Sequence, residues 1–128
     1  MSEVLLTSQK FVVERREFIV PGRGAITREI VTHPGAVIIL PVLDDKHIVM
    51  IHNYRYTVGA ELTELPAGTL EPPEKPIVCA KRELEEETGY VAGRIEPMGT
   101  FYTTPGFTNE LMYCFVAHDL TKMQQKLV

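Results

Sequence analysis

Cysteine is scarce in this sequence, with Cys79 and Cys114 the only two among 128 residues. Two cysteines do not form the disulfide framework of a small secreted protein, so we expect buried free thiols in a cytoplasmic protein. The sequence has no run of about 18 apolar residues, and residues 1–3 do not begin a signal-peptide pattern, so no membrane partner is expected. Basic residues form no patch, which argues against nucleic acid as a partner.

The composition is that of one globular domain. Hydrophobic residues make up 45% of the chain and charged residues 23%, and 128 residues are enough to bury a core. The formal net charge is −4, but the acidity is local, because six of the 17 acidic residues lie between Gly68 and Tyr90. Chemistry is therefore expected first in the segment 68–90.

Strand-like runs alternate with turn signals along most of the chain. Residues 10–20 and 25–32 are rich in β-branched and aromatic residues and flank the turn cluster 21–24, so the first 32 residues are predicted to form a hairpin. Further strands are predicted at residues 36–43, 47–55, 61–65, 91–103 and 110–118. The first of these is almost wholly apolar, as a central strand would be. The fold class is α+β or mixed α/β, with a mixed sheet and one helix.

That helix is predicted over residues 76–88. Pro76 suits a first helical turn, where a missing N–H costs nothing, and Gly89 suits the left-handed residue that ends a helix. Residues suited to packing recur between them at spacings of three and four and form one predicted stripe: Ile77, Ala80, Leu84 and Thr88. At about 100° per residue, the acidic residues Glu83, Glu86 and Glu87 fall on a different face.

Three carboxylates on one helix face repel each other. One interpretation is a solvated acidic face, as most charge runs are. The other is a site for a hard divalent cation, which takes oxygen ligands. The spacing favours the cation site, because Gly-x5-Glu-x7-Arg-Glu-aliphatic-x-Glu-Glu-x-Gly fixes seven residue identities. At about 7% for each residue, a chance match is roughly one in 10⁸ per starting position.

Residues 68–90 resemble the Nudix box, the signature of hydrolases that cleave nucleoside diphosphates linked to another group. The match is complete at the charged and glycine positions, and Tyr90 stands where the family usually has an aliphatic residue. The resemblance implies an α+β chain with the α/β/α sandwich-like Nudix fold. In that fold a mixed β-sheet carries the Nudix loop and helix, which an N-terminal β-hairpin precedes here.

The resemblance also implies a cofactor, Mg²⁺ or alternatively Mn²⁺. The metal ligands that it implies are Glu83, Glu86, Glu87 and the backbone carbonyl of Ala67. Arg82 completes the predicted catalytic set and, with Glu74, braces the loop through bidentate hydrogen bonds. A bound metal neutralises phosphate oxygens and activates water, so the box predicts hydrolysis of a phosphorus–oxygen bond. The four histidines lack ligand spacing and are expected to be strand or turn residues: His33, His47, His52 and His118.

Three features outside the box resemble the ADP-ribose pyrophosphatase subgroup, namely Glu64–Gly68, Asn53–Tyr56, and Pro105, sixteen residues beyond Gly89. The alternative for Pro105 alone is a plain turn residue in Pro-Gly. The subgroup implies hydrolysis of a nucleoside diphosphate sugar, above all of ADP-ribose to AMP and ribose 5-phosphate. The substrate-binding residues that it implies are Arg55, Gly68, Pro105, Arg28 and Glu29.

The N-terminal hairpin is expected to pack against something, because a two-stranded hairpin is not stable alone. In the subgroup this hairpin packs across a two-fold axis, and residues near Arg28 and Glu29 help to hold the adenosine of the neighbouring subunit. The resemblance therefore implies a homodimer. Residues 1–32 are the predicted dimerisation hairpin, and residues 33–128 are the predicted Nudix domain.

The resemblance covers about residues 10 to 120. Members of the subgroup continue with an acidic loop, whose glutamate serves as general base or metal ligand, and then with a strand and a long helix. Residues 122–128 contain no carboxylate, so we expect a shortened domain that lacks the C-terminal helix. The alternative function is a catalytically impaired protein that still binds metal and nucleotide, because a missing general base removes about 10²–10⁴-fold of rate.

Overall fold

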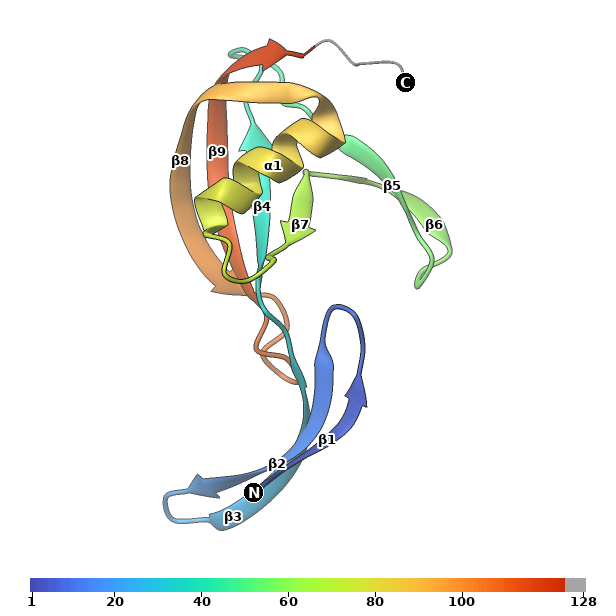
Figure 1. Cartoon of the computed structure of the whole chain (residues 1–128), viewed down its shortest axis with the longest axis vertical. Coiled ribbons are helices and arrows are strands. Elements are labelled where there is room, and N and C mark those ends of the chain that lie inside the picture. Colours follow the sequence, from blue (N-terminus) through green and yellow to red (C-terminus); the bar gives the residue numbers. More distant parts are fainter. Residues whose placement is uncertain (124–128) are drawn as a thin grey trace.

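The computed structural model describes residues 1–123, so the predicted end of the Nudix domain at residue 128 lies outside the described residues. Ten elements follow one another within these described residues: β1 (Ser2–Thr7), β2 (Val12–Val20), β3 (Gly24–Thr32), β4 (Ala36–Pro41), β5 (Ile51–Arg55), β6 (Ala60–Glu64), β7 (Ala67–Thr69), α1 (Pro76–Thr88), β8 (Tyr90–Tyr102) and β9 (Leu111–Lys122). The strands form three separate sheets, and α1 lies across the largest of them (Figure 1). Among residues 1–123, no helix is long and apolar enough to cross a membrane.

The largest sheet has the strand order β7-β4-β9-β8. Its central strand β4 runs parallel to β9 and antiparallel to β7, while β8 and β9 form a long antiparallel hairpin. The sheet is therefore mixed, as the sequence predicts, and the apolar strand β4 lies inside it, between β7 and β9. With one helix in the described part of the chain, the predicted α+β class is confirmed.

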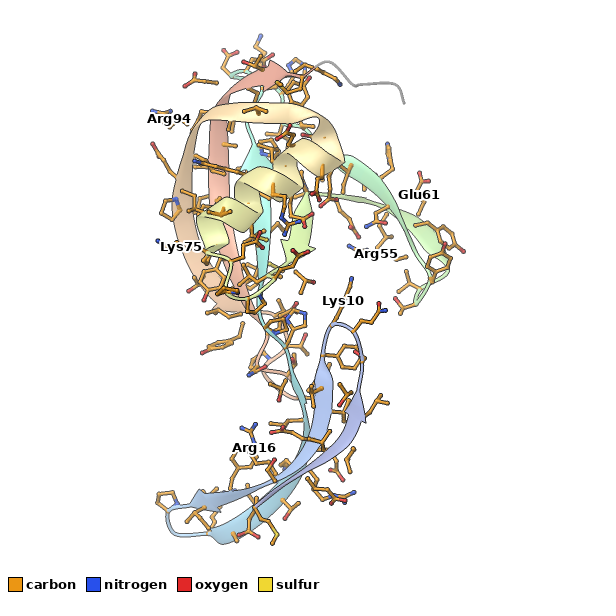
Figure 2. All side chains as sticks on the ribbon, viewed as in Figure 1. Lys10, Arg16, Arg55, Glu61, Lys75 and Arg94 are labelled. Atoms are coloured by element: carbon orange, nitrogen blue, oxygen red, sulfur yellow. The ribbon has the colours of Figure 1, made fainter. Side chains whose placement is uncertain are left out.

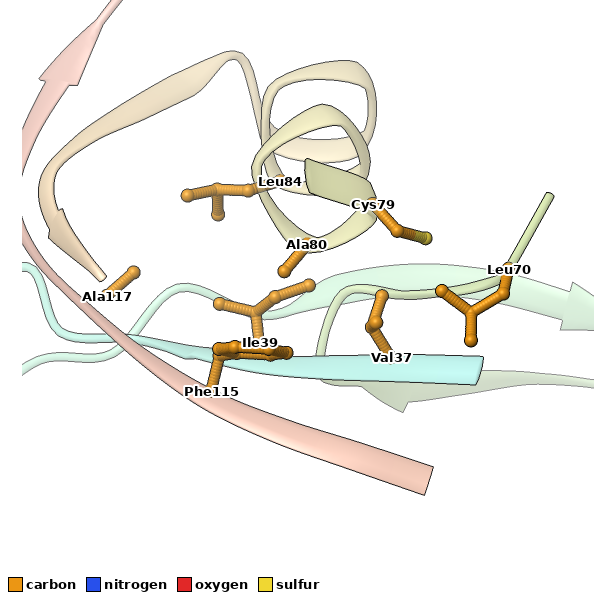
Figure 3. Close-up of a cluster of buried hydrophobic side chains, with 8 residues drawn as sticks. All are labelled: Val37, Ile39, Leu70, Cys79, Ala80, Leu84, Phe115 and Ala117. Carbon is orange, nitrogen blue, oxygen red and sulfur yellow. The ribbon is translucent and has the colours of Figure 1, made fainter. Parts of the chain in front are cut away.

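The hydrophobic core lies between α1 and this sheet (Figure 3). Its buried members come from β4, β9, α1 and the loop after β7: Val37, Ile39, Leu70, Cys79, Ala80, Leu84, Phe115 and Ala117. Val37 and Ile39 alternate along β4 and are both 0% exposed, as expected for two residues on the same covered face of a strand. The helix is thus fixed to the sheet next to β7, where the predicted box begins.

The helix has the predicted ends but not the whole predicted stripe. Gly89 has a φ of 77° and its N–H donates to the carbonyl of Glu85, so it ends the helix in the left-handed conformation. Ala80 and Leu84 are buried as predicted, whereas Ile77 is 37% exposed. Cys79 is buried as well, in the same core as Ala80 and Leu84. It lies over the edge strand β7 of the sheet, where the Cys79 thiol faces the carbonyl of Thr69 at 3.8 Å.

The N-terminal region contains one more strand than the sequence predicts. The hairpin of β2 and β3 is confirmed, with Val12 opposite Thr32 and Val20 opposite Gly24. The missed strand is β1, which pairs antiparallel with the other edge of β2. Every residue of β1 is exposed, so its sequence carries no alternation of buried and polar positions that would mark a strand. This three-stranded sheet extends away from the body of the molecule (Figure 1).

A third sheet consists of β5 and β6 alone. The two strands pair antiparallel, with Ile51 opposite Glu64 and Arg55 opposite Ala60. The hairpin projects from the body on the side of β7 (Figure 1). Together, β7 and this hairpin place Arg55 and the Nudix-like loop on the same side of the molecule.

Candidate active site

The site is built on a close contact between β7 and α1. Gly68 is paired with Val37 of β4, and the carboxyl group of Glu83 occupies the space that a side chain at position 68 would need. A Cβ added at Gly68 would overlap that carboxyl group. The first glycine of the pattern is therefore required by packing, and it holds the Glu83 carboxylate against the backbone of β7.

Glu87 lies one helical turn beyond Glu83 and reaches the same strand. Its Oε1 accepts a hydrogen bond from the backbone N–H of Ala67 at 3.1 Å. Burial raises the pKa of Glu87 to about 6, the Ala67 N–H opposes this rise, and the charge of Glu83 adds to it. Two carboxylates four residues apart therefore face β7 in a partly desolvated place, where the charge of Glu83 disfavours ionisation of Glu87.

Arg82 ties the loop before the helix to this pair. Its Nε and Nη2 donate to the two carboxylate oxygens of Glu74 at 3.0 and 2.9 Å, and its Nη1 donates to Glu83 Oε1 at 2.9 Å. The guanidinium holds the pKa of Glu74 at about 2, and Glu74 in turn raises the pKa of Arg82. The same Nη1 lies 3.4 Å from Glu86 Oε2. Arg82 thus orients carboxylates on both sides of it.

Arg55 of β5 is anchored in the same way by Glu64 of β6. The Nε and Nη2 of Arg55 donate to the two oxygens of Glu64 at 2.8 and 2.7 Å. This pair raises the pKa of Arg55 and lowers that of Glu64. Among residues 1–123, Nη1 of Arg55 has no hydrogen-bond partner. It remains available to an anion.

These groups share one cavity of about 580 Å³. Five predicted site residues line it: Ala67, Gly68, Glu83, Glu87 and Arg55. Lys10 lines it from the loop between β1 and β2, and Figure 2 shows Lys10 and Arg55 directed toward the space between the body and the N-terminal sheet. The cavity therefore brings carboxylates and cationic side chains together, as a site for a metal-bound anion requires.

The remaining predicted site residues lie outside this lining. The side chain of Glu86 is 58% exposed and bound to Arg82. Arg28 and Glu29 lie on β3, where Arg28 bonds the carbonyl of Thr27 and Glu29 accepts from Arg15. Pro105 lies in the loop between β8 and β9 and does not line the cavity either.

The residues fit a divalent cation in their chemistry. Within residues 1–123, no group of three or more histidine, cysteine, aspartate or glutamate side chains is arranged to hold a metal ion. Arg82 bonds Glu83 and Glu86. Glu83 and Glu87 nevertheless offer only oxygen donors, which suits Mg²⁺ or Mn²⁺. Burial and, to a lesser extent, the charge of Glu83 raise the pKa of Glu87, and a bound cation would favour its ionised form.

Sequence reasoning missed part of the cavity wall. The cavity is also lined by residues that were not among the predicted site residues: Lys10, His33, Asn53, Glu71 and Glu110. Glu110 lies shortly after Pro105, which the resemblance assigns to substrate binding. Its position in the same loop is therefore a sequence signal for a site residue. His33 carried no such signal, because it marks the turn into β4 and reaches the cavity only through folding.

Comparisons with known proteins find relatives of this chain. A family model described as NUDIX domain matches residues 32–127. The ADP-ribose pyrophosphatase of Bacillus subtilis (strain 168) is 44% identical over 106 residues, which are 83% of this chain and 57% of that protein. The methanol dehydrogenase activator of Bacillus methanolicus is 43% identical over 104 residues, 81% of this chain and 56% of that protein. The chain thus spans less than two thirds of the length of these relatives.

The fold has a counterpart among solved structures. A crystal structure of an ADP compounds hydrolase superposes with a TM-score of 0.83 at 25% identity, over 99% of this chain and 69% of that chain. Because nearly all of this chain takes part, the match includes the N-terminal sheet as well as the body.

Proposed function

The chain belongs to the Nudix hydrolase family, and from that premise we propose that it hydrolyses the diphosphate of a nucleoside diphosphate sugar, with ADP-ribose cleaved to AMP and ribose 5-phosphate. The observation that carries the proposal is the single cavity shared by Glu83, Glu87 and Arg55. The name of the Bacillus subtilis relative supports ADP-ribose as the substrate.

Mg²⁺ or Mn²⁺ is proposed to be held by Glu83, Glu87 and the carbonyl of Ala67, with Glu86 as a further carboxylate. A cation bound there would neutralise charge on the diphosphate and activate a water molecule. Arg82 keeps the Glu83 carboxylate oriented through a hydrogen bond of 2.9 Å. Gly68 lets the backbone of β7 approach that carboxylate.

Arg55 is the proposed phosphate-binding residue. Because Glu64 holds one edge of its guanidinium, the side chain is pre-oriented and loses little freedom when it binds an anion. Pro105 is proposed to border the terminal sugar, and Arg28 and Glu29 of a second copy to contact the adenosine. The proposal therefore includes a homodimer formed through the N-terminal sheet. Two unpaired cysteines suit a reducing compartment, so we place the protein in the cytoplasm.

The test is to incubate the purified protein with ADP-ribose and Mg²⁺ and to measure AMP by chromatography. The Glu83→Gln/Glu87→Gln double variant is expected to lose at least about 100-fold of the rate, since it lacks the charges that hold the cation. Glu85→Gln is the matched control, because Glu85 is an exposed glutamate on the same helix. It should retain wild-type activity.

Wild-type AMP formation no faster than that of the double variant would contradict the hydrolase proposal. Binding of ADP-ribose and Mg²⁺ without AMP would then identify the alternative, a catalytically impaired protein that binds metal and nucleotide. If AMP forms, comparing ADP-ribose with other sugar nucleotides and with nucleoside triphosphates identifies the substrate.

A further inference from the structure

His33 occupies the junction between the N-terminal sheet and the body, directly after β3. Its side chain is 12% exposed, and its Nδ1 accepts a hydrogen bond of 2.9 Å from the backbone N–H of Gly35. A neutral imidazole that accepts at Nδ1 carries its proton on Nε2. That Nε2 lies 3.4 Å from Oε2 of Glu110, within ion-pair distance, so this edge of the ring faces the carboxylate.

Glu110 is held on both of its carboxylate oxygens. Oε1 accepts a hydrogen bond of 2.6 Å from Oγ1 of Thr103, while Oε2 faces His33. The side chain is 25% exposed and lines the same cavity as Glu83 and Glu87. A further carboxylate thus stands in the proposed site. Its orientation is set by Thr103, at the start of the loop between β8 and β9, and by His33, at the junction before β4.

Backbone contacts fix the same junction. The N–H of Val31 donates to the carbonyl of Phe107 at 2.8 Å, and the N–H of Asn109 donates to the carbonyl of Val31 at 3.3 Å. The backbone N–H of His33 donates to Oδ1 of Asn109 at 2.9 Å. The end of β3 and the loop that carries Glu110 therefore form one connected unit, and His33 is its side-chain contact with the cavity wall.

We propose that His33 is a positioning residue, whose Nε2–H holds the Glu110 carboxylate in the cavity for the hydroxyl-bearing part of the substrate. This rests on the proposed function. A carboxylate repels a diphosphate, so Glu110 is suited to the part of a sugar nucleotide that donates hydrogen bonds. His33 does not act on substrate itself, because both of its ring nitrogens face protein groups. Without the imidazole, the carboxylate keeps only the Thr103 contact and gains freedom to turn.

Two variants separate positioning from a purely structural role. His33→Asn keeps an acceptor close to the place of Nδ1 for Gly35 but loses the contact with Glu110. His33→Gln keeps a donor close to the place of Nε2 for Glu110 but loses the Gly35 contact. We expect His33→Asn to raise KM for ADP-ribose about tenfold with kcat within about twofold of wild type, as loss of a hydrogen bond to a charged group would do. We expect His33→Gln to keep KM close to wild type and to lower the thermal midpoint instead.

A double-variant cycle completes the kinetic test. If His33 acts through Glu110, then His33→Asn should add less than about twofold to the KM of Glu110→Gln, because the two substitutions remove one shared interaction. Additive effects, or an unchanged KM in His33→Asn, would overturn the proposal.

A readout without activity keeps this inference separate from the hydrolase proposal. In ¹⁵N NMR spectra of the wild-type protein, the His33 ring should show the tautomer protonated at Nε2, and Glu110→Gln should shift the Nε2 resonance more than the Nδ1 resonance. A ring protonated at Nδ1, or a Glu110→Gln spectrum identical to wild type at His33, would overturn the positioning role even if ADP-ribose were hydrolysed. Hydrolysis of no sugar nucleotide, with the expected spectrum, would reject the proposed function and leave the contact established.

Discussion

Gly68 and Glu83 occupy complementary space, because the absent side chain of one makes room for the carboxyl group of the other. Gly68→Ala should therefore displace Glu83, destabilise the protein by about 1–3 kcal/mol and weaken Mg²⁺ binding. Thermal unfolding and titration with Mg²⁺ measure the two effects. Gly106→Ala is the control, since a Cβ there meets nothing within 4 Å and should leave both quantities unchanged. Equal changes in stability and in Mg²⁺ binding for Gly68→Ala and Gly106→Ala would contradict the contact between Gly68 and Glu83.

Glu87 makes the metal-free protein sensitive to pH. Burial raises its pKa from 4.5 to about 6 in the folded state, so ionisation costs more in the folded than in the unfolded protein. Below pH 4.5 the carboxyl is protonated in both states and this penalty is absent; it grows as pH rises and is complete above pH 6. In EDTA, Glu87→Gln should therefore have a higher thermal midpoint than wild type at pH 7.5 and the same midpoint at pH 4. A gain of equal size at both pH values would show that the charge of Glu87 is not its cause.

Single residues differ in how far the sequence predicts their roles. Glu83 and Glu87 share a helix face by spacing alone, so their pairing follows from local geometry. His33 and Glu110 meet through folding, since the junction before β4 and the loop after β8 are distant in sequence. Their residue types fit strand ends and turns equally well. No local pattern therefore marks them as partners, and only the sheet topology brings them together.

At the scale of one element, α1 is held by the side chains that it buries. Leu84 is 1% exposed in the core, so Leu84→Ala should destabilise the protein by about 2–5 kcal/mol through lost burial and a residual cavity. Val78 is an apolar residue on the same helix that is 51% exposed, and Val78→Ala should change stability by less than about 0.5 kcal/mol. Denaturant unfolding measures both. A loss in Val78→Ala close to that in Leu84→Ala would contradict the assignment of Leu84, and not of Val78, to the buried face of α1.

Elements with strong local signals are the ones that the sequence predicts. The helix between Pro76 and Gly89 and the apolar strand β4 carry such signals in their end residues and composition. The placement of Ile77 on the packed stripe is wrong, because the buried residues of α1 are Cys79, Ala80 and Leu84, whereas Ile77 in the first turn is 37% exposed. Strand β1 failed because its pairing with β2 leaves all its residues exposed.

The whole molecule combines a packed body with a N-terminal sheet that extends from it (Figure 1). Apolar side chains on that sheet are left uncovered, including Val4 at 59%, Leu6 at 55% and Ile19 at 75% exposure. The sheet is joined to the body by the junction at His33 and by the backbone hydrogen bonds of Val31. Exposed apolar strands of this kind are covered when proteins associate, which is the physical basis for proposing a dimer through this sheet.

Ile19 tests that proposal at the scale of the assembly. Ile19→Asp should weaken self-association by at least about tenfold, because it places a charge on an apolar surface that the second copy would cover. Sedimentation velocity over a concentration series measures the change, with Val58→Asp as control, since Val58 is 62% exposed on the turn between β5 and β6. Arg28 and Glu29 of one copy are proposed to contact the adenosine bound by the other. In that case the KM for ADP-ribose should rise when the Ile19→Asp dimer dissociates into monomers. The wild-type protein should show the same rise in KM only at much lower protein concentration. A wild-type mass that is monomeric at every concentration, or equal weakening by Val58→Asp, would rule out the N-terminal sheet as the subunit contact.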